Sequence, residues 1–154
     1  GDFTGAAFGA GYFIRLALTD DGTAFDVRVF NLDKGYDASI PAERRSGFTQ
    51  AGSIVIAPNG RYAVYALAEI AQLGTPNQRV RTVFMLIDLV TMTQQALTEP
   101  ITTFVRPTAW TEDNSAVIFT SPQQDGTWKI MLQDRRLNKI AEPTYLGALQ
   151  VAIE

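Results

Sequence analysis

The stretch APNGRYAVYA at 57–66, followed by TVFMLIDLVTMTQQALTEP at 82–100, has a second version in WTEDNSAVIFTS at 110–121 and TWKIMLQDRRLNKIAEP at 127–143. In both versions a polar turn leads into an apolar run, and a second apolar run follows after a loop. Asn59-Gly60 matches Asp113-Asn114 at an offset of 54, and Asp88 matches Asp134 at an offset of 46. The difference falls in the loop between the two runs, where insertions cost least. The sequence therefore predicts a repeated structural unit.

A weaker third copy lies near the start of the chain, where YFIRLALTDDGTAFDVRVFNLDKG at 12–35 resembles AVIFTSPQQDGTWKIMLQDRRLNK at 116–139. Each unit is typical of four antiparallel strands joined by tight turns. A sheet of four strands cannot bury both of its faces alone, so neighbouring sheets must stack on it. In TVFMLIDL (82–89) both faces carry apolar residues, which favours a sheet packed between two others. This pattern predicts blades of β-propeller type.

Short runs rich in Thr, Val, Ile, Phe and Tyr, separated by Gly, Pro, Asn and Asp, indicate an all-β chain. The expected strands are Tyr12–Leu18, Phe25–Leu32, Ser53–Ala57, Tyr62–Ala68, Arg79–Leu89, Phe104–Trp110, Ala116–Thr120, Trp128–Gln133 and Tyr145–Ile153, with shorter ones at Gln95–Thr98 and Lys139–Glu142. Only YALAEIAQL at 65–73 competes as a helix, since its residues have high helix propensity. It runs directly into the turn Gly74-Thr75-Pro76-Asn77, so a long hairpin is favoured there over a short helix.

The chain of 154 residues is expected to form a single β domain, 1–154. Its predicted parts are a partial blade at about 12–41, a blade at 53–100, a blade at 104–143 and a terminal strand at 145–153. The first blade would lack its opening strand, and Tyr145–Ile153 would either complete that blade or begin a fourth. Closed propellers have four to eight blades, so the ring is expected to be incomplete. A two-sheet β-sandwich is the alternative.

The turn and strand residues Ala57-Pro58-Asn59-Gly60 and Trp110–Asn114 resemble the WD-like repeat of TolB-type β-propellers. That repeat is similar to the one in the propeller domain of dipeptidyl peptidase IV-type enzymes. The first copy here keeps Pro and Gly but lacks the aromatic residue of the repeat, and the second has Glu for Pro and Asn for Gly. The resemblance implies a scaffold that presents loops to partner proteins. It also implies an extracytoplasmic location, in the periplasm or at the cell surface.

The composition excludes several kinds of site. The chain has no His and no Cys, which removes Ser-His-Asp triads, thiol nucleophiles and zinc fingers, and no cofactor is expected. A net charge of −3 argues against nucleic acid as a partner, because binding to its backbone depends on clustered cations. No apolar run has the length of about 18–20 residues needed for a membrane span.

Carboxylates remain as possible acid–base or metal groups. Those at Asp20-Asp21, Glu112-Asp113 and Asp125 lie in predicted turns, where Asp commonly stabilises the backbone. We expect Asp88 and Asp134 to accept backbone N–H bonds where matching strands end. Trp110 and Trp128 are expected to pack in the core.

The predicted function is therefore that of a non-catalytic β-propeller-like scaffold or binding domain, with a protein or a cell-envelope component as its partner. The expected contact residues are Gly74, Thr75, Pro76 and Asn77 in the loop that distinguishes one unit from another, together with Arg79, Arg81 and Arg106. The three arginines could bind a carboxylate or phosphate, or they could simply protect solvated strand edges. Exposed edges could also pair two copies into a homo-oligomer. The alternative function is that of an accessory propeller of a larger hydrolase, or of a carboxylate-based enzyme.

Overall fold

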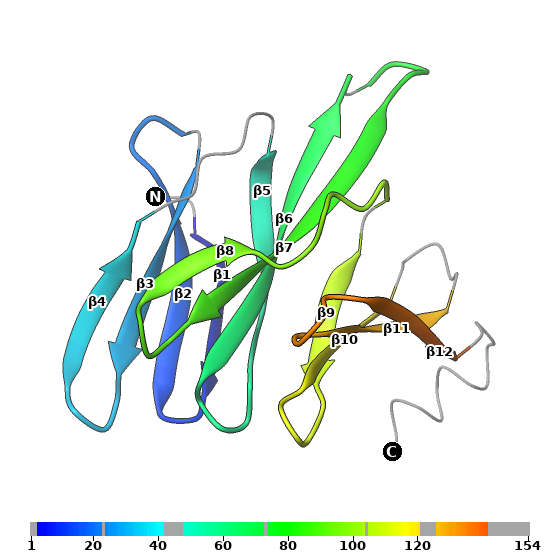
Figure 1. Cartoon of the computed structure of the whole chain (residues 1–154). Helices are drawn as coiled ribbons and strands as arrows, with labels where there is room; N and C mark the ends of the chain where they lie inside the picture. The colour runs from blue at the N-terminus through cyan, green and yellow to red at the C-terminus, as the bar shows by residue number, and fades with distance from the viewer. Residues whose placement is uncertain are drawn as a thin grey trace.

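The described part of the chain forms three four-stranded antiparallel sheets, seen in a computed structural model (Figure 1). The structure describes residues 3–22, 24–41, 48–72, 74–103, 105–120 and 126–141. The first sheet contains β1 (Phe3–Gly9), β2 (Tyr12–Leu18), β3 (Phe25–Asn31) and β4 (Tyr36–Ile40); the second contains β5 (Phe48–Ile56), β6 (Tyr62–Ala71), β7 (Arg79–Asp88) and β8 (Thr93–Ala96); the third contains β9 (Arg106–Trp110), β10 (Ala116–Thr120), β11 (Thr127–Met131) and β12 (Leu137–Ala141). Each sheet is built from strands that are consecutive in the sequence.

The second sheet lies between the other two and buries both of its faces. Val83 and Met85 of β7 pack into the core shared with the first sheet. Phe84 and Leu86 of the same strand pack into the core shared with the third. The opening strands of neighbouring sheets lie against each other, β1 beside β5 and β5 beside β9. The prediction of a sheet packed between two others is thus confirmed, and the two-sheet sandwich is wrong because there are three sheets.

The second and third sheets have equivalent backbone hydrogen bonds in the turn between their first two strands. After the first strand, the amide of Ala57 donates to the carbonyl of Tyr62, as the amide of Thr111 does to that of Ala116. These residues are related by the predicted offset of 54. The equivalent residue before the second strand has a left-handed backbone in both sheets, Gly60 with φ +73° and Asn114 with φ +63°.

The predicted match between Asp88 and Asp134 is wrong, as the hydrogen bonds of the turn after the third strand show. In the first two sheets the amide of Gly35 donates to the carbonyl of Asn31, and the amide of Met92 donates to that of Asp88. In the third sheet the amide of Arg135 donates to Met131. Met131 is therefore the structural equivalent of Asp88. Asp134 lies inside the turn, and its side chain accepts the amide of Arg136.

The first unit is a complete sheet, so the prediction that it lacks an opening strand is wrong. Phe3–Gly9 forms β1, which pairs with β2 along its length. The sequence of β1 is rich in Gly and Ala, which have low strand propensity, but small residues suit its contact with β5. A Cβ atom on Gly5 would lie 3.4 Å from the Cα of Gly52, and one on Gly9 would lie 3.3 Å from Cβ of Ile56. The predicted terminal strand Tyr145–Ile153 lies outside the described residues, as does Asp125.

The hairpin favoured for residues 65–73 is confirmed. β6 and β7 pair in unbroken register from Tyr62 opposite Asp88 to Ala71 opposite Arg79. The helix propensity of YALAEIAQL is overridden, because in a strand Val64 and Ala66 face one core while Tyr65 and Leu67 face the other. β5 begins at Phe48 rather than Ser53, since a bulge around Ser53 lets the strand continue despite a φ of +61° there.

Candidate functional site

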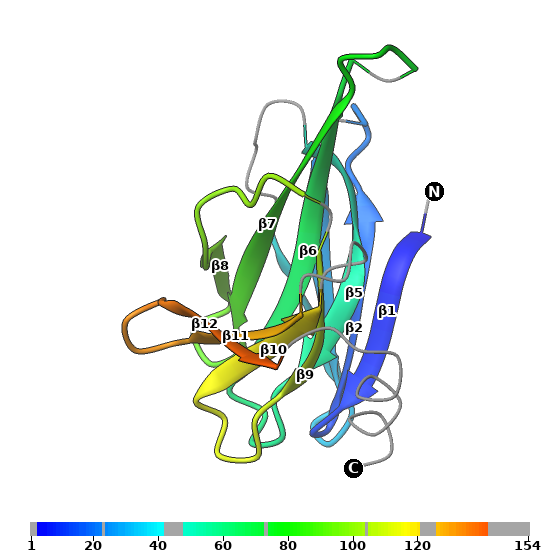
Figure 2. The same cartoon turned by 90° about the vertical axis from the view of Figure 1, so that its right-hand side faces the viewer.

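The β6–β7 hairpin extends beyond the ends of the other strands, and both views show its tip standing clear of the sheets (Figures 1 and 2). Gly74–Asn77 form this tip, and all of them are exposed. The half of the hairpin away from the tip packs in the two cores, through residues 63–67 and 83–87. The tip is therefore attached to a rigid base. The structure thus places the predicted contact loop at the most prominent projection of the described chain.

The tip is held in shape by its own hydrogen bonds. The amide of Gly74 donates to Oε1 of Gln78 at 3.0 Å, and the hydroxyl of Thr75 donates to the carbonyl of Gln72 at 2.7 Å. The amide of Asn77 in turn donates to Oγ1 of Thr75 at 3.2 Å. Gly74 has a φ of +79°, a conformation that Gly adopts without steric cost. A loop ordered in this way loses less conformational entropy when it binds a partner.

The three candidate arginines differ in their surroundings. Arg79 is exposed at the base of the tip. Arg81 forms an ion pair with Glu69 across the hairpin, and its guanidinium lies 5.2 Å from the ring centre of Phe48. Arg106 lies on β9 in the third sheet, where it is exposed while its neighbours Val105 and Pro107 are buried. Because Glu69 already neutralises Arg81, the hairpin is a poor site for a free anion.

Asp88, one of the carboxylates singled out from the sequence, stabilises the turn after β7. Oδ1 of Asp88 accepts the amides of Val90 at 2.9 Å and Thr91 at 3.1 Å, and Oδ2 accepts Nη2 of Arg61 at 3.1 Å. Partial burial acts to raise the pKa of Asp88, but these hydrogen bonds outweigh it and the pKa is lowered. In the part of the chain that the structure describes, no group of three or more carboxylates gathers as a metal site.

Asp113 organises the turn between β9 and β10. Its Oδ1 accepts the hydroxyl of Ser115 at 2.7 Å, the hydroxyl of Thr111 at 2.7 Å and the amide of Ser115 at 3.1 Å. These bonds, those from Ser115 and Thr111 foremost, lower the pKa of Asp113 from 3.8 to about 2. A carboxylate whose pKa falls on folding stabilises the folded state only while it is ionised.

Asp113→Asn is therefore expected to make the protein less stable at pH 6. The difference from wild type should shrink as the pH falls from 3.8 to about 2, because wild-type Asp113 is protonated over that range. Urea unfolding at a series of pH values measures it. Glu112→Gln is the control in the same turn, since Glu112 is exposed and only its backbone carbonyl accepts a hydrogen bond from Asn114 among the described residues. A difference for Asp113→Asn that stays constant down to pH 2 would contradict the assigned role.

Trp110 has the core position expected from the sequence. The residue is 7% exposed, and its ring stacks on Tyr62 with 6.3 Å between ring centres. Its Nε1 donates to the carbonyl of Val55 at 2.9 Å, which joins the third sheet to the second. Trp128 is half-buried and stacks on Phe119. Both tryptophans therefore have structural roles.

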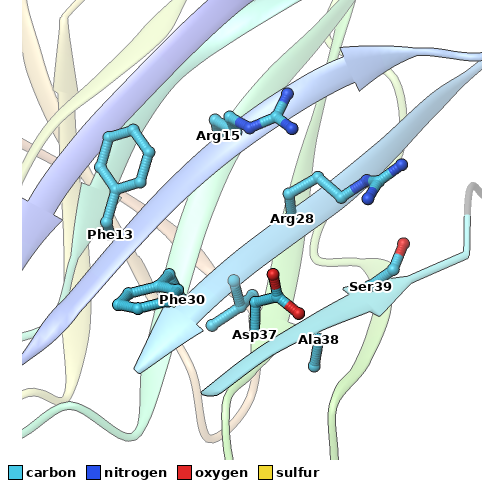
Figure 3. A pocket seen from close by; sticks show the side chains of 8 residues that line it. Phe13, Arg15, Arg28, Phe30, Asp37, Ala38 and Ser39 are labelled. Carbon is cyan, nitrogen blue, oxygen red and sulfur yellow. The ribbon is translucent and has the colours of Figure 1, made fainter. Parts of the chain in front are cut away.

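Sequence reasoning missed a concave surface on the first sheet, on the face turned away from the second. A cavity of about 420 Å³ lies there, and its wall includes Phe13, Arg15, Arg28 and Phe30 (Figure 3). These residues alternate with core residues along β2 and β3, so each of them taken singly is typical of an exposed strand position.

The described residues contain no helix that is long and apolar enough to cross a membrane.

Comparison with solved structures places this architecture among known folds. The chain is similar to the β-propeller domain of the trilobed protease from Pyrococcus furiosus, with a TM-score of 0.57 and 10% identity over 93% of this chain and 43% of that one. The fold is that of an incomplete β-propeller. An oligogalacturonate lyase matches with a TM-score of 0.55 and 15% identity over 84% of this chain and 37% of the lyase. Dipeptidyl peptidase 4 of Porphyromonas gingivalis matches at 0.53 and 10%, over 86% of this chain and 26% of the peptidase.

These likenesses establish the propeller fold and nothing finer, because the identities are low. The chain spans less than half the length of each of these structures. No protein-family model matches the sequence, and a search of curated proteins finds no match either. Membership of the TolB-type family therefore stays a prediction.

Proposed function

We propose that this propeller portion is a non-catalytic binding module whose β6–β7 hairpin contacts a protein or a cell-envelope component. The observation that carries the proposal is the tip Gly74–Asn77, which projects from a base held by two cores and is ordered by its own hydrogen bonds. Loops that carry recognition on a rigid scaffold are the usual functional elements of such folds.

The chemistry of the hairpin favours a polar partner surface. The tip offers the side-chain amide of Asn77 and exposed backbone groups, and Arg79 adds a positive charge at its base. Arg81 and Glu69 form a neutralised pair below it, which orients the strands and leaves little net charge. Such an element suits hydrogen bonding to a folded surface more than capture of a charged small molecule.

The location and assembly belong to the same proposal. The resemblance of the repeat to TolB-type propellers supports an extracytoplasmic location. The edge strands of the three sheets offer a route to a homo-oligomer through strand pairing.

Deletion of Gly74–Asn77 tests the proposal. The deletion leaves Gln72, Leu73 and Gln78 to connect Ala71 to Arg79, a loop length that hairpins accept. We expect folding to be retained, because the deleted residues lie outside both cores. Proteins captured by tagged wild type from an extract of the source cells, and measured by quantitative mass spectrometry, should be lost from the deletion variant.

The matched control is a shortened turn elsewhere. Replacing the exposed residues Asp20-Asp21-Gly22 at the β2–β3 turn with Asn-Gly shortens another turn of the same chain and should leave the captured proteins unchanged. Equal capture by the wild type and by the hairpin deletion, with both folded by circular dichroism, would refute the hairpin as the contact site.

A second candidate function is that of an accessory propeller of a hydrolase. It is favoured by the similarity to propeller structures from a protease and a peptidase. Under this function the hairpin binds a catalytic domain. The same capture experiment separates the two, because a hydrolase would then be the protein lost on deletion of Gly74–Asn77.

A further inference from the structure

The outer face of the first sheet carries two ordered rows of side chains, set by the pairing of its strands. One row crosses the sheet through Phe8, Phe13, Phe30 and Asp37, and the next crosses it through Ala6, Arg15, Arg28 and Ser39. Residues that are opposite each other in antiparallel strands share a face, so each row forms a continuous strip. An aromatic strip therefore lies beside a cationic one.

Arg15 and Arg28 stand directly opposite each other on β2 and β3. Like charges in this arrangement, with Cβ atoms about 4.5–5.5 Å apart, repel each other. Within the described ranges neither guanidinium forms an ion pair. The carboxylate of Asp37 belongs to the aromatic row, opposite Phe30, and Asp26 pairs with Ala17 one step beyond the cationic row. The two arginines thus form a like-charged pair with no carboxylate in their own row, and Asp26 and Asp37 lie in the rows on either side.

The aromatic row provides an apolar surface beside these charges. Phe8 and Phe13 pack with 4.5 Å between ring centres. Phe8 is 74% exposed and Phe30 is 37% exposed, both large values for Phe in a sheet. Figure 3 shows Arg15 and Arg28 extending side by side over the sheet, with Phe13 and Phe30 at the other end of the same concavity. The cavity of about 420 Å³ is of the size that small organic ligands occupy.

The outer face of the first sheet differs in composition from the faces that pack between sheets. This difference argues against another sheet packing on it. The buried faces between sheets are lined by aliphatic and aromatic residues. Here two like charges lie in the middle strands, and in the cavity wall only the carboxylate of Asp37 is present to balance them. An apolar cover that excludes water would therefore bury an excess positive charge at a large energetic cost. A ligand that brings its own negative charge removes that cost. The wall of the cavity carries two arginines and one carboxylate, Asp37, so an anion complements its net positive charge.

We propose that the outer face of the first sheet binds an organic anion, with a carboxylate or phosphate on Arg15 and Arg28 and an apolar ring against Phe13 and Phe30. Two guanidinium groups side by side can donate paired hydrogen bonds to the oxygens of one such group. Ser39 lies at the end of the cationic row and offers a hydroxyl to the same oxygens. This site is separate from the β6–β7 hairpin, so it can be tested independently of the proposed function.

Isothermal titration of the full chain at low ionic strength tests the site with four probes: phenyl phosphate, benzoate, inorganic phosphate and the uncharged benzyl alcohol. Phenyl phosphate and benzoate should both bind. The one with the higher affinity shows whether the site prefers a phosphate or a carboxylate. Inorganic phosphate should bind about tenfold more weakly than phenyl phosphate, because it lacks the ring. Benzyl alcohol binding as tightly as both anions would overturn the proposal, as would the absence of binding by every anion at millimolar concentration.

Variants then assign the binding to these residues. The double variant Arg15→Gln, Arg28→Gln should weaken binding of phenyl phosphate by about tenfold or more, since it removes charged hydrogen bonds. Arg136→Gln, which changes an exposed arginine in the turn between β11 and β12, should leave the affinity unchanged. Phe30→Ala should weaken phenyl phosphate but not inorganic phosphate. The double variant should fold, because it relieves a like-charge contact on an exposed face, and its melting temperature confirms this. Equal affinity of wild type and the double variant would refute the site.

Discussion

Trp110→Ala is expected to lower the free energy of unfolding by about 3–5 kcal/mol, the range for removing a large buried aromatic side chain. Trp110 is 7% exposed, and the change takes away its ring together with the stacking on Tyr62. It also removes the hydrogen bond from Nε1 to the carbonyl of Val55, which joins two sheets. The loss is large because Trp110 belongs to the core that the second and third sheets share.

Urea unfolding followed by circular dichroism measures the effect. Trp110→Phe keeps a buried ring but not the hydrogen bond, so it should cost less than Trp110→Ala. Trp128→Ala is the matched control, because Trp128 is half-buried and lies at the margin of the same core. If Trp128→Ala were as damaging as Trp110→Ala, the attachment of the third sheet would depend on other contacts.

Thr82→Val is the second large effect, with an expected loss of about 1–3 kcal/mol from unpaired buried polar groups. Thr82 is fully buried in β7. Its hydroxyl donates to the carbonyl of Thr103 at 2.8 Å and accepts the amide of Val105 at 3.3 Å. Its backbone also pairs with Ile101. Valine has nearly the same shape, so the loss reports the hydrogen bonds that fix the connection leading to β9.

Thr82→Ser separates the hydroxyl from the methyl group, because it keeps the hydrogen bonds and removes one methyl. It should therefore cost less than Thr82→Val. Thr108→Val is the surface control, since the exposed Thr108 gives up only a hydrogen bond of 3.1 Å to the carbonyl of Ile118. Thermal melting of the three variants in parallel gives the order. A loss for Thr108→Val equal to that for Thr82→Val would show that burial of Thr82 is not the cause.

The second sheet could be predicted from the sequence because its strands contribute apolar side chains to two cores, one on each face. TVFMLIDL has apolar residues at consecutive positions, which only a strand packed on both faces requires. The opening strand of the first sheet could not be predicted in this way. Its small residues are set by the close approach of Gly5 to Gly52, a contact between segments far apart in the chain.

The candidate sites also divide into those that local sequence predicts and those that depend on contacts between distant segments. The β6–β7 tip follows from local turn residues, so the sequence alone located it. The sequence alone did not reveal that Arg81 is neutralised by Glu69, because this ion pair depends on the pairing of β6 with β7. The pairing of Arg15 with Arg28 depends on register, yet a signal was present in Phe13-Ile14-Arg15 and Arg28-Val29-Phe30. These are mirror-image triplets that antiparallel pairing superimposes, aromatic on aromatic and cation on cation.

Because every sheet is made from strands that follow one another directly, synthesis on the ribosome delivers the sheets one at a time. The first can complete its backbone pairing before the second has been translated. The second, however, carries Phe84 and Leu86 on the side that the third sheet later covers. Until β9–β11 leave the exit tunnel, that side of the nascent chain is open to non-native association, and the time taken to translate the third sheet sets how long this vulnerable interval lasts.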